Sequence, residues 1–194
     1  MYYNLVSEPV DLPIDIDLIK KHVEIDFSDN SEDAYLNELA RSAIAYFEGL
    51  TGCVLLTSTY ELYLDCFPPC CLIQIMRKPN VAVTSVEYLV DGVFTAVSTD
   101  DYYLAQTQEW AVIDLEEGKD WPTNADVKLN SVKITFTVGY GTNFDDVPYD
   151  LKNALLQHIA SLFENRGDCD CGEAVPDLTK LVYTRYTPLN LDAC

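Results

Sequence analysis

The sequence predicts an α+β protein in which a small helical bundle carries an inserted antiparallel β domain. Apolar residues recur at spacings of three and four over residues 31–51 and again over 148–166, which is the period of an amphipathic helix. Between these stretches, residues 58–138 carry several short runs in which apolar and polar side chains alternate, as in strands. Because helical and strand patterns are segregated along the chain, they indicate α+β and not α/β.

The bundle is expected to hold two long helices and a short N-terminal one. Pro13 opens the short helical pattern, which ends near Ile25. Asn30 or Ser31 can cap the first turn of the long helix at 31–51. The second long helix follows Pro148 and extends to residue 166. The apolar side chains expected to form the core of the bundle are Leu36, Leu39, Phe47, Leu151, Leu155 and Leu162.

The β domain is expected to contain at least six strands. Asp91-Gly92, between two apolar runs, predicts a hairpin turn, and residues 115–130 are polar enough to form a loop. Gly139-Tyr140-Gly141 is expected to turn the chain from the last strand towards the second long helix. The predicted strands are 58–65, 72–76, 81–90, 101–105, 110–114 and 131–138.

The chain ends are expected to be extended, with residues 1–11 as an arm and 178–194 as a C-terminal tail. The alternative for the tail is a last edge strand of the β domain. The predicted organisation is therefore an arm and helices at 1–57, the β domain at 58–138, a core helix with an acidic loop at 139–177, and the tail at 178–194.

The net charge limits the possible partners. Twelve Lys and Arg stand against 32 Asp and Glu, which gives a formal net charge of −20. Such a surface repels phosphate groups, so it disfavours independent binding to nucleic acid or to an anionic membrane. The ordinary interpretation is solubility, and a more specific one is a surface past which DNA slides without sticking.

The cysteines offer one possible metal site. The sequence has no secretory signal and no apolar run long enough to span a bilayer, so we expect cytoplasmic synthesis and reduced thiols. Two cysteine-rich segments could bind zinc if they meet, although their spacing departs from the usual C-x₂-C pairs. The alternative is that the cysteines pack as small hydrophobes, and on that basis no metal or cofactor is expected. The zinc candidates are Cys66, Cys70, Cys169 and Cys171, with Cys71 beside them.

No pattern predicts catalysis. His22 and His158 are the only histidines, and His158 borders the apolar stripe of a predicted helix, as a packed core histidine does. The sequence holds no G-x-S-x-G and no H-E-x-x-H. Gly139-Tyr140-Gly141 lacks the third glycine of a dinucleotide-binding loop, because Phe144 stands in its place.

Eight short strings, taken in order, resemble the head–tail connector family of long-tailed bacteriophages, also called head–tail adaptors or head-completion proteins. The resemblance spans residues 14–166. It departs from the family at Cys53, where a basic residue is common, and in the cysteine-rich segments. The strings are Leu18-Ile19-Lys20-Lys21-His22-Val23-Glu24-Ile25-Asp26, Glu32-Asp33-Ala34-Tyr35-Leu36, Glu48-Gly49-Leu50-Thr51-Gly52, Tyr60-Glu61-Leu62-Tyr63-Leu64-Asp65, Lys78-Pro79, Ser85-Val86-Glu87-Tyr88, Phe136-Thr137-Val138-Gly139-Tyr140-Gly141, and Val147-Pro148 through Glu164-Asn165-Arg166.

The resemblance implies a structural protein of the virion neck. Members of the family look like a helical bundle with a β insertion, and they form a closed ring, here expected to have 12 copies, under the portal protein. The expected partners are the portal, neighbouring copies in contact through the two long helices, and the next neck or tail protein, with DNA passing unbound through the channel. The C-terminal tail of such proteins reaches towards the portal, which makes the docking candidates Leu181, Tyr183, Arg185, Tyr186 and Leu189.

Tyr and Arg are frequent anchors of protein interfaces, which independently favours these tail residues. Two alternatives remain at this point. One is another phage component, such as a tail-terminator or tail-completion protein. The other is a small interaction module whose cysteine loops hold a metal.

Overall fold

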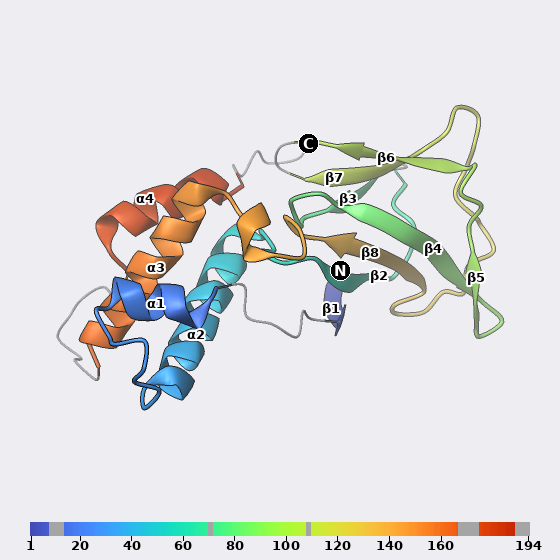
Figure 1. Cartoon of the computed structure of the whole chain (residues 1–194). Helices are drawn as coiled ribbons and strands as arrows, with labels where there is room; N and C mark the ends of the chain where they lie inside the picture. The colour runs from blue at the N-terminus through green and yellow to red at the C-terminus, as the bar shows by residue number, and fades with distance from the viewer. Residues whose placement is uncertain (8–13, 70–71, 108–109, 167–174, 189–194) are drawn as a thin grey trace. The chain divides into compact units, whose positions relative to one another are not determined.

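The structure is a computed structural model that describes residues 1–7, 14–69, 72–107, 110–166 and 175–188. It divides into a β unit, Met1–Pro9 with Thr57–Tyr140, and a helical unit, Val10–Leu56 with Gly141–Cys194 (Figure 1). The predicted α+β class is confirmed. The elements in chain order are β1 (Tyr2–Ser7), α1 (Ile16–His22), α2 (Asp33–Thr51), β2 (Ser58–Leu64), β3 (Ile73–Ile75), β4 (Ala82–Val90), β5 (Val93–Ala96), β6 (Tyr102–Gln106), β7 (Ala111–Leu115), β8 (Val132–Val138), the 3₁₀ turn η1 (Phe144–Asp146), α3 (Tyr149–Glu164) and α4 (Asp177–Tyr186).

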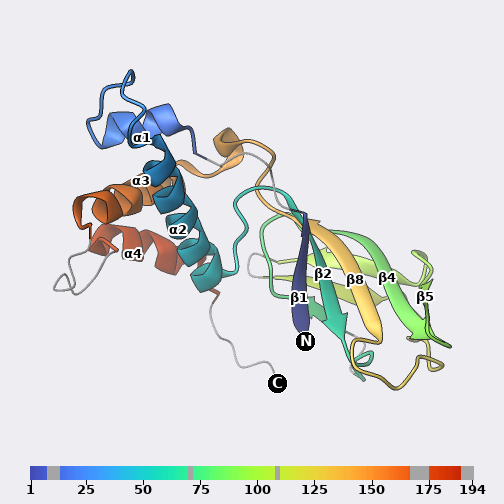
Figure 2. The ribbon, with the colours of Figure 1, turned by 90° about the horizontal axis from the view of Figure 1, so that it is seen from below.

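The β unit stacks a three-stranded sheet, in the order β3-β7-β6, on a five-stranded sheet, in the order β1-β2-β8-β4-β5 (Figures 1 and 2). All pairs of neighbouring strands are antiparallel. The predicted alternation of β8 is confirmed, because Val132, Ile134, Phe136 and Val138 are fully buried while the residues between them are half-buried. Successive side chains of a strand point to opposite faces, so this pattern fixes which face of β8 meets the core.

The hairpin predicted at Asp91-Gly92 joins β4 to β5, with Val90 opposite Val93. Both turn residues have positive φ, 51° and 81°, as a two-residue hairpin turn of this type requires. The carboxylate of Asp126 accepts hydrogen bonds from both backbone N–H groups at 3.1 Å. The loop at 115–130 therefore stabilises this turn.

The helical unit packs α2 and α4 on α3, with α1 alongside (Figure 2). α2 and α3 match the two predicted long helices closely in their bounds. Gly52 ends α2 with a left-handed φ of 69°, as glycine at this position of a helix commonly does. Gly141 precedes η1 and has no room for a side chain, because the Asp146 side chain occupies the space where a Cβ would stand.

Two predictions about the chain ends are wrong. The N-terminal arm is strand β1, which pairs with β2 and so belongs to the β unit. The predicted extended tail begins with helix α4, so residues 178–186 are neither extended nor an edge strand. Pairing with β2 orders β1, and burial of Thr179 and Tyr183 orders α4; the local sequence pattern indicated neither.

Candidate interaction surfaces

The residues predicted to dock on a portal differ in their burial on helix α4. The side chain of Tyr183 is fully buried, with its ring 5.0 Å from that of Phe47 and 6.4 Å from that of Tyr46, measured between centroids. Its hydroxyl lies 3.3 Å from Nδ1 of His158. Burial raises the pKa of Tyr183 far above its ordinary value. Tyr183 therefore holds α4 on the bundle and presents nothing to a partner.

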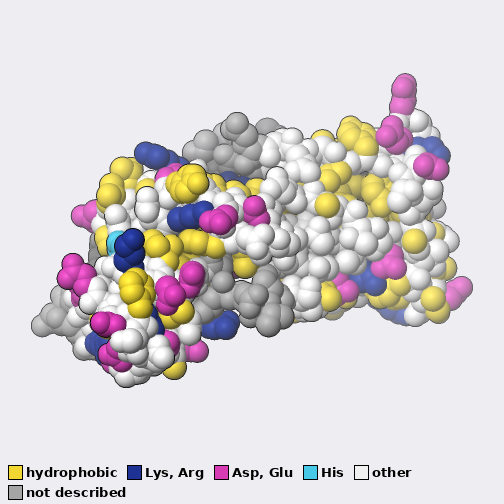
Figure 3. Space-filling view, in the orientation of Figure 1, with side chains coloured by type: hydrophobic (Ala, Val, Ile, Leu, Met, Phe, Trp, Pro, Cys, Tyr) yellow, Lys and Arg dark blue, Asp and Glu magenta, His cyan; other side chains and the backbone are white. Residues whose placement is uncertain are grey.

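The opposite side of α4 is open to solvent. Leu178 and Leu181 are 60% and 58% exposed, and Arg185, four residues after Leu181, is exposed as well. Residues three and four apart share one side of a helix, so these three form one surface, here called the α4 face. On the viewed side of the helical unit, Figure 3 shows apolar side chains scattered among acidic ones. Two apolar groups next to a guanidinium are chemistry suited to a protein partner.

The remaining docking candidates are Tyr186 and Leu189. Tyr186 is half-buried, and its hydroxyl donates a hydrogen bond of 2.9 Å to Oδ1 of Asp150. Burial, followed by this carboxylate, raises the pKa of Tyr186 well above its ordinary value. Leu189 lies outside the described residues. Sequence reasoning missed Leu178, although Pro176-Asp177 is a helix-start signal from which the α4 face could have been found.

The residues predicted for the core and for contacts between copies are mostly interior. Leu36, Phe47, Leu151 and Leu155 are fully buried within one chain. Leu39 and Leu162 are half-buried. The first four stabilise the unit, so any contact made by these helices with another copy must use their exposed residues, such as Tyr35, Tyr46, Leu50 and Tyr149.

His158 is the packed core histidine that the sequence predicts. It is 2% exposed, and the ring of Tyr46 meets its ring edge-on with centroids 5.4 Å apart. Burial lowers the pKa of His158 below its ordinary value, so the ring is neutral at physiological pH. A neutral ring inside the bundle fits a structural role.

The zinc candidates are only partly placed. Cys66 is exposed, whereas Cys70, Cys169 and Cys171 lie outside the described residues. Within the part of the chain that the structure describes, no group of three or more His, Cys, Asp or Glu side chains could hold a metal ion. Among those same residues, no helix is long and apolar enough to cross a membrane.

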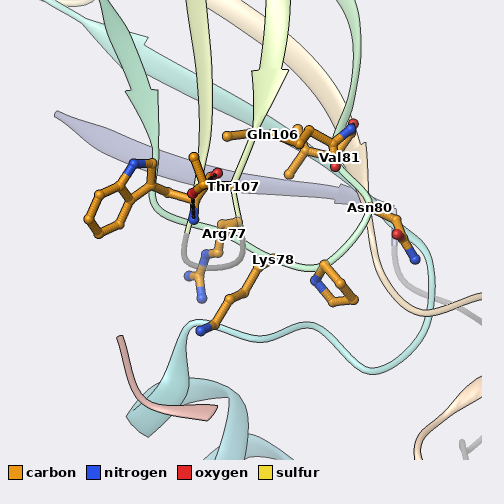
Figure 4. Close-up of a pocket in the computed structure, with 9 residues that line it drawn as sticks. Arg77, Lys78, Asn80, Val81, Gln106 and Thr107 are labelled. Carbon is orange, nitrogen blue, oxygen red and sulfur yellow. Dashed lines mark hydrogen bonds between the residues drawn. The ribbon is translucent and has the colours of Figure 1, made fainter. Parts of the chain in front are cut away.

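A small basic hollow of about 170 Å³ lies in the β unit (Figure 4). Arg77 and Lys78 line it, together with Gln106, whose amide donates a hydrogen bond of 2.7 Å to the carbonyl of Val81. The guanidinium of Arg77 lies 5.3 Å from the ring of Tyr3. The described lining residues include no carboxylate, imidazole or thiol, so they do not form an acid–base or nucleophilic site.

Comparison with solved structures finds full-length matches. One chain from the neck of an empty gene transfer agent particle, computed with C6 symmetry, matches with a TM-score of 0.86 and 24% identity, over 100% of this chain and 99% of that one. A chain from the virion of a native gene transfer agent particle matches with a TM-score of 0.85 and 24% identity over the same shares. A third, from the neck of a native particle computed with C12 symmetry, has a TM-score of 0.79 and 23% identity, again over 100% and 99%.

No family model matches the chain. No curated protein sequence matches it either. The structural matches show a known fold over the whole length of this chain.

Proposed function

We propose that this protein is a structural head–tail adaptor that forms a ring of twelve copies in the neck of a tailed phage or phage-like particle. The observation that carries the proposal is the full-length match to chains of gene transfer agent necks, which covers both units. The ordered strings that resemble phage head–tail connectors support the same assignment independently. The twelvefold symmetry used for one matched neck supports twelve copies.

In this proposal the work of the protein is mechanical. The ring lies under the portal, extends the DNA channel and presents a surface to the next neck or tail protein. The charge of −20 per chain, repeated around a ring, repels DNA and lets it pass without binding. The proposal includes no catalysis and no cofactor.

The portal-docking surface is proposed to be the α4 face, together with the segment that follows Pro188. Leu181 and Arg185 keep their predicted role, Leu178 joins them, and Tyr183 leaves the set because it is buried. Each contact of this size is modest, but a ring engages many at once, so avidity makes docking stable.

Mass photometry of the purified protein, alone and mixed with portal rings of the same particle, tests the proposal. We expect a mass increase equal to many copies of this chain per portal ring. No complex at micromolar concentration with intact portal rings would contradict the proposal and favour the alternative of a tail-terminator or tail-completion protein. Tightly held zinc in at least about half of the chains would favour the metal-binding module.

The docking surface needs its own variants. Deletion of residues 181–194 would remove Tyr183 from the core and is therefore unsuitable. Leu181→Glu combined with Arg185→Glu changes only exposed side chains, and Asn153→Glu, at an exposed position of α3, is the control for added charge. We expect the double variant to lose about tenfold or more in affinity for the portal, and the control to bind as the parent does.

A further inference from the structure

The five-stranded sheet of the β unit is open at both edges. β1 and β5 are its outermost strands, and neither has a strand partner on its outer side among the described residues. All four residues of β5 are exposed, including Val93 at 66% and Phe94 at 37%. On β1, Tyr2 is 57% exposed and Leu5 is 39% exposed. An open edge offers unpaired N–H and C=O groups to another strand.

Neither edge strand carries a charged side chain. Charged side chains on an edge strand are a common protection, and 44 of the 194 residues of this chain are Asp, Glu, Lys or Arg. Even so, β1 reads YYNLVS and β5 reads VFTA, without one charged residue. A bulge between Leu5 and Ser7 interrupts the pairing of β1 with β2. Tyr2–Leu5 is therefore a regular stretch of four residues, which is also the length of β5.

The outward backbone groups of β5 follow from its hydrogen bonds. The N–H of Val97 donates to the carbonyl of Val86 at 2.8 Å, so Val97, and by alternation Thr95 and Val93, face β4. Phe94 and Ala96 therefore direct their N–H and C=O groups away from the sheet. The outward residues of β1 follow in the same way. The N–H of Leu89 in β4 donates to the carbonyl of Ser131, next to β8, and this bond fixes which residues of β8 face β4. When the alternation is followed from β8 through β2 to β1, Tyr3 and Leu5 are the residues of β1 whose N–H and C=O groups point away from the sheet.

The two edges are compatible in direction. Every neighbour in the order β1-β2-β8-β4-β5 is antiparallel, so β5 runs parallel to β1. If the axis of the ring runs parallel to the strands, rotation from one copy to the next leaves the direction of the strands unchanged. It also leaves the same face of each sheet turned towards the axis. The β5 edge of one copy can therefore meet the β1 edge of the next as a parallel pair, and this contact is heterologous, as a closed ring requires.

We propose that neighbouring copies join through their β units, with β5 of one copy adding to β1 of the next. The occupant of each edge is a second copy of this chain. The inference rests on the proposed ring, in which every copy has a neighbour on each side, and it specifies where the copies meet. Main-chain hydrogen bonds of Phe94 and Ala96 to Tyr3 and Leu5 give the contact its register.

Ala96→Pro against Ala96→Val is the matched test. Proline removes an N–H that makes no bond to β4, and an outward N–H on an edge strand is a position at which proline is tolerated. Valine keeps the N–H and suits an exposed strand. Leu5→Pro, compared with Leu5→Val, applies the same change to the other edge. Thermal unfolding by circular dichroism selects the variants that keep the parent fold.

Mass photometry over a concentration series, with and without portal rings, gives the readout. We expect both proline variants to raise the concentration of half-maximal ring assembly about tenfold or more, and both valine variants to match the parent. Folded proline variants that assemble at the parent concentration would overturn the edge contact and leave the adaptor proposal standing. A parent chain that forms no ring, alone or on portals, would overturn both.

Discussion

The hydroxyl of Tyr183 lies 3.3 Å from Nδ1 of His158, and this contact joins α4 to α3 inside the helical unit. Both side chains are nearly or fully buried, and the rings of Tyr46 and Phe47 from α2 pack around them. The last described helix of the chain is thus part of the core and not an appendage. This relationship determines which residues near the C-terminus are available to a partner.

Tyr183→Ala should lower the free energy of unfolding by about 4 kcal/mol, because it leaves a large cavity among α2, α3 and α4. Tyr183→Phe keeps the ring and loses only the contact with His158, so it should cost about 1 kcal/mol. Urea denaturation followed by far-UV circular dichroism measures both values. A Tyr183→Ala protein as stable as the parent but unable to bind the portal would instead identify Tyr183 as a docking residue.

The stability of the protein should fall as the pH drops below about 6.5, in part through His158. Burial lowers the pKa of His158 in the folded state, so the unfolded chain takes up this proton at a higher pH than the folded chain does. The contribution of neutral His158 to the free energy of unfolding is complete above the unfolded-state pKa of 6.5. It is lost as the pH falls towards the lower pKa of the folded state.

One such proton gives a slope of at most about 1.4 kcal/mol per pH unit. His158→Gln should remove this part of the slope, as measured by urea denaturation between pH 7.5 and 5.5 on the same buffer series. Equal slopes in the parent and the variant would show that His158 does not contribute.

The ion pair between the buried Lys20 of α1 and the partly exposed Asp33 of α2 should be costly to break by removing the carboxylate. Nζ of Lys20, on a side chain that is 1% exposed, lies 2.7 Å from Oδ1 of Asp33 and 2.9 Å from Oδ1 of Asn30. Asp33→Asn leaves the buried ammonium without its carboxylate and should lower the free energy of unfolding by about 3 kcal/mol. Lys20→Met replaces the cation with an apolar group of similar length, and it should cost clearly less. A chemical denaturation series compares the two, and the reverse ranking would refute this account.

Gly141→Ala should displace the side chain of Asp146, because the added Cβ would overlap it. Oδ2 of Asp146 accepts the N–H of Asn143 at 3.1 Å in the cap of η1, so the variant should lose about 1 kcal/mol of stability. In the Asp146→Ala background the same substitution has less to displace and should cost less. A double-mutant cycle from thermal or urea unfolding measures the coupling, and purely additive costs would count against it.

The elements that the sequence predicted correctly share one property, which is a strong local signal. In β8, Val132 to Val138 alternate without interruption, and Asp91-Gly92 supplies the positive φ values of its turn. α2 and α3 each carry an apolar stripe over more than four turns. Such patterns can be read without knowledge of distant contacts, because the spacing of the apolar residues alone indicates which side of the element is buried.

The chain ends lack such a signal. Tyr2–Ser7 alternates poorly, and its strand state comes from pairing with β2, which is more than fifty residues away. Asp177–Tyr186 contains β-branched and aromatic residues of middling helix propensity, and Tyr183 entering the core is what makes it a helix. A pattern confined to these segments cannot record contacts made by distant ones.

The sequence by itself determined the α+β class, the two long helices, the central strands and their hairpin, since periodicity and turn chemistry are local properties. Only the tertiary structure decided that Tyr183 is interior while Leu181 and Arg185 are outside. It also decided that β1 and β5 are the two edges of one sheet. The physical reason is that burial and strand order depend on which segments meet, and residues far apart in the sequence determine those meetings.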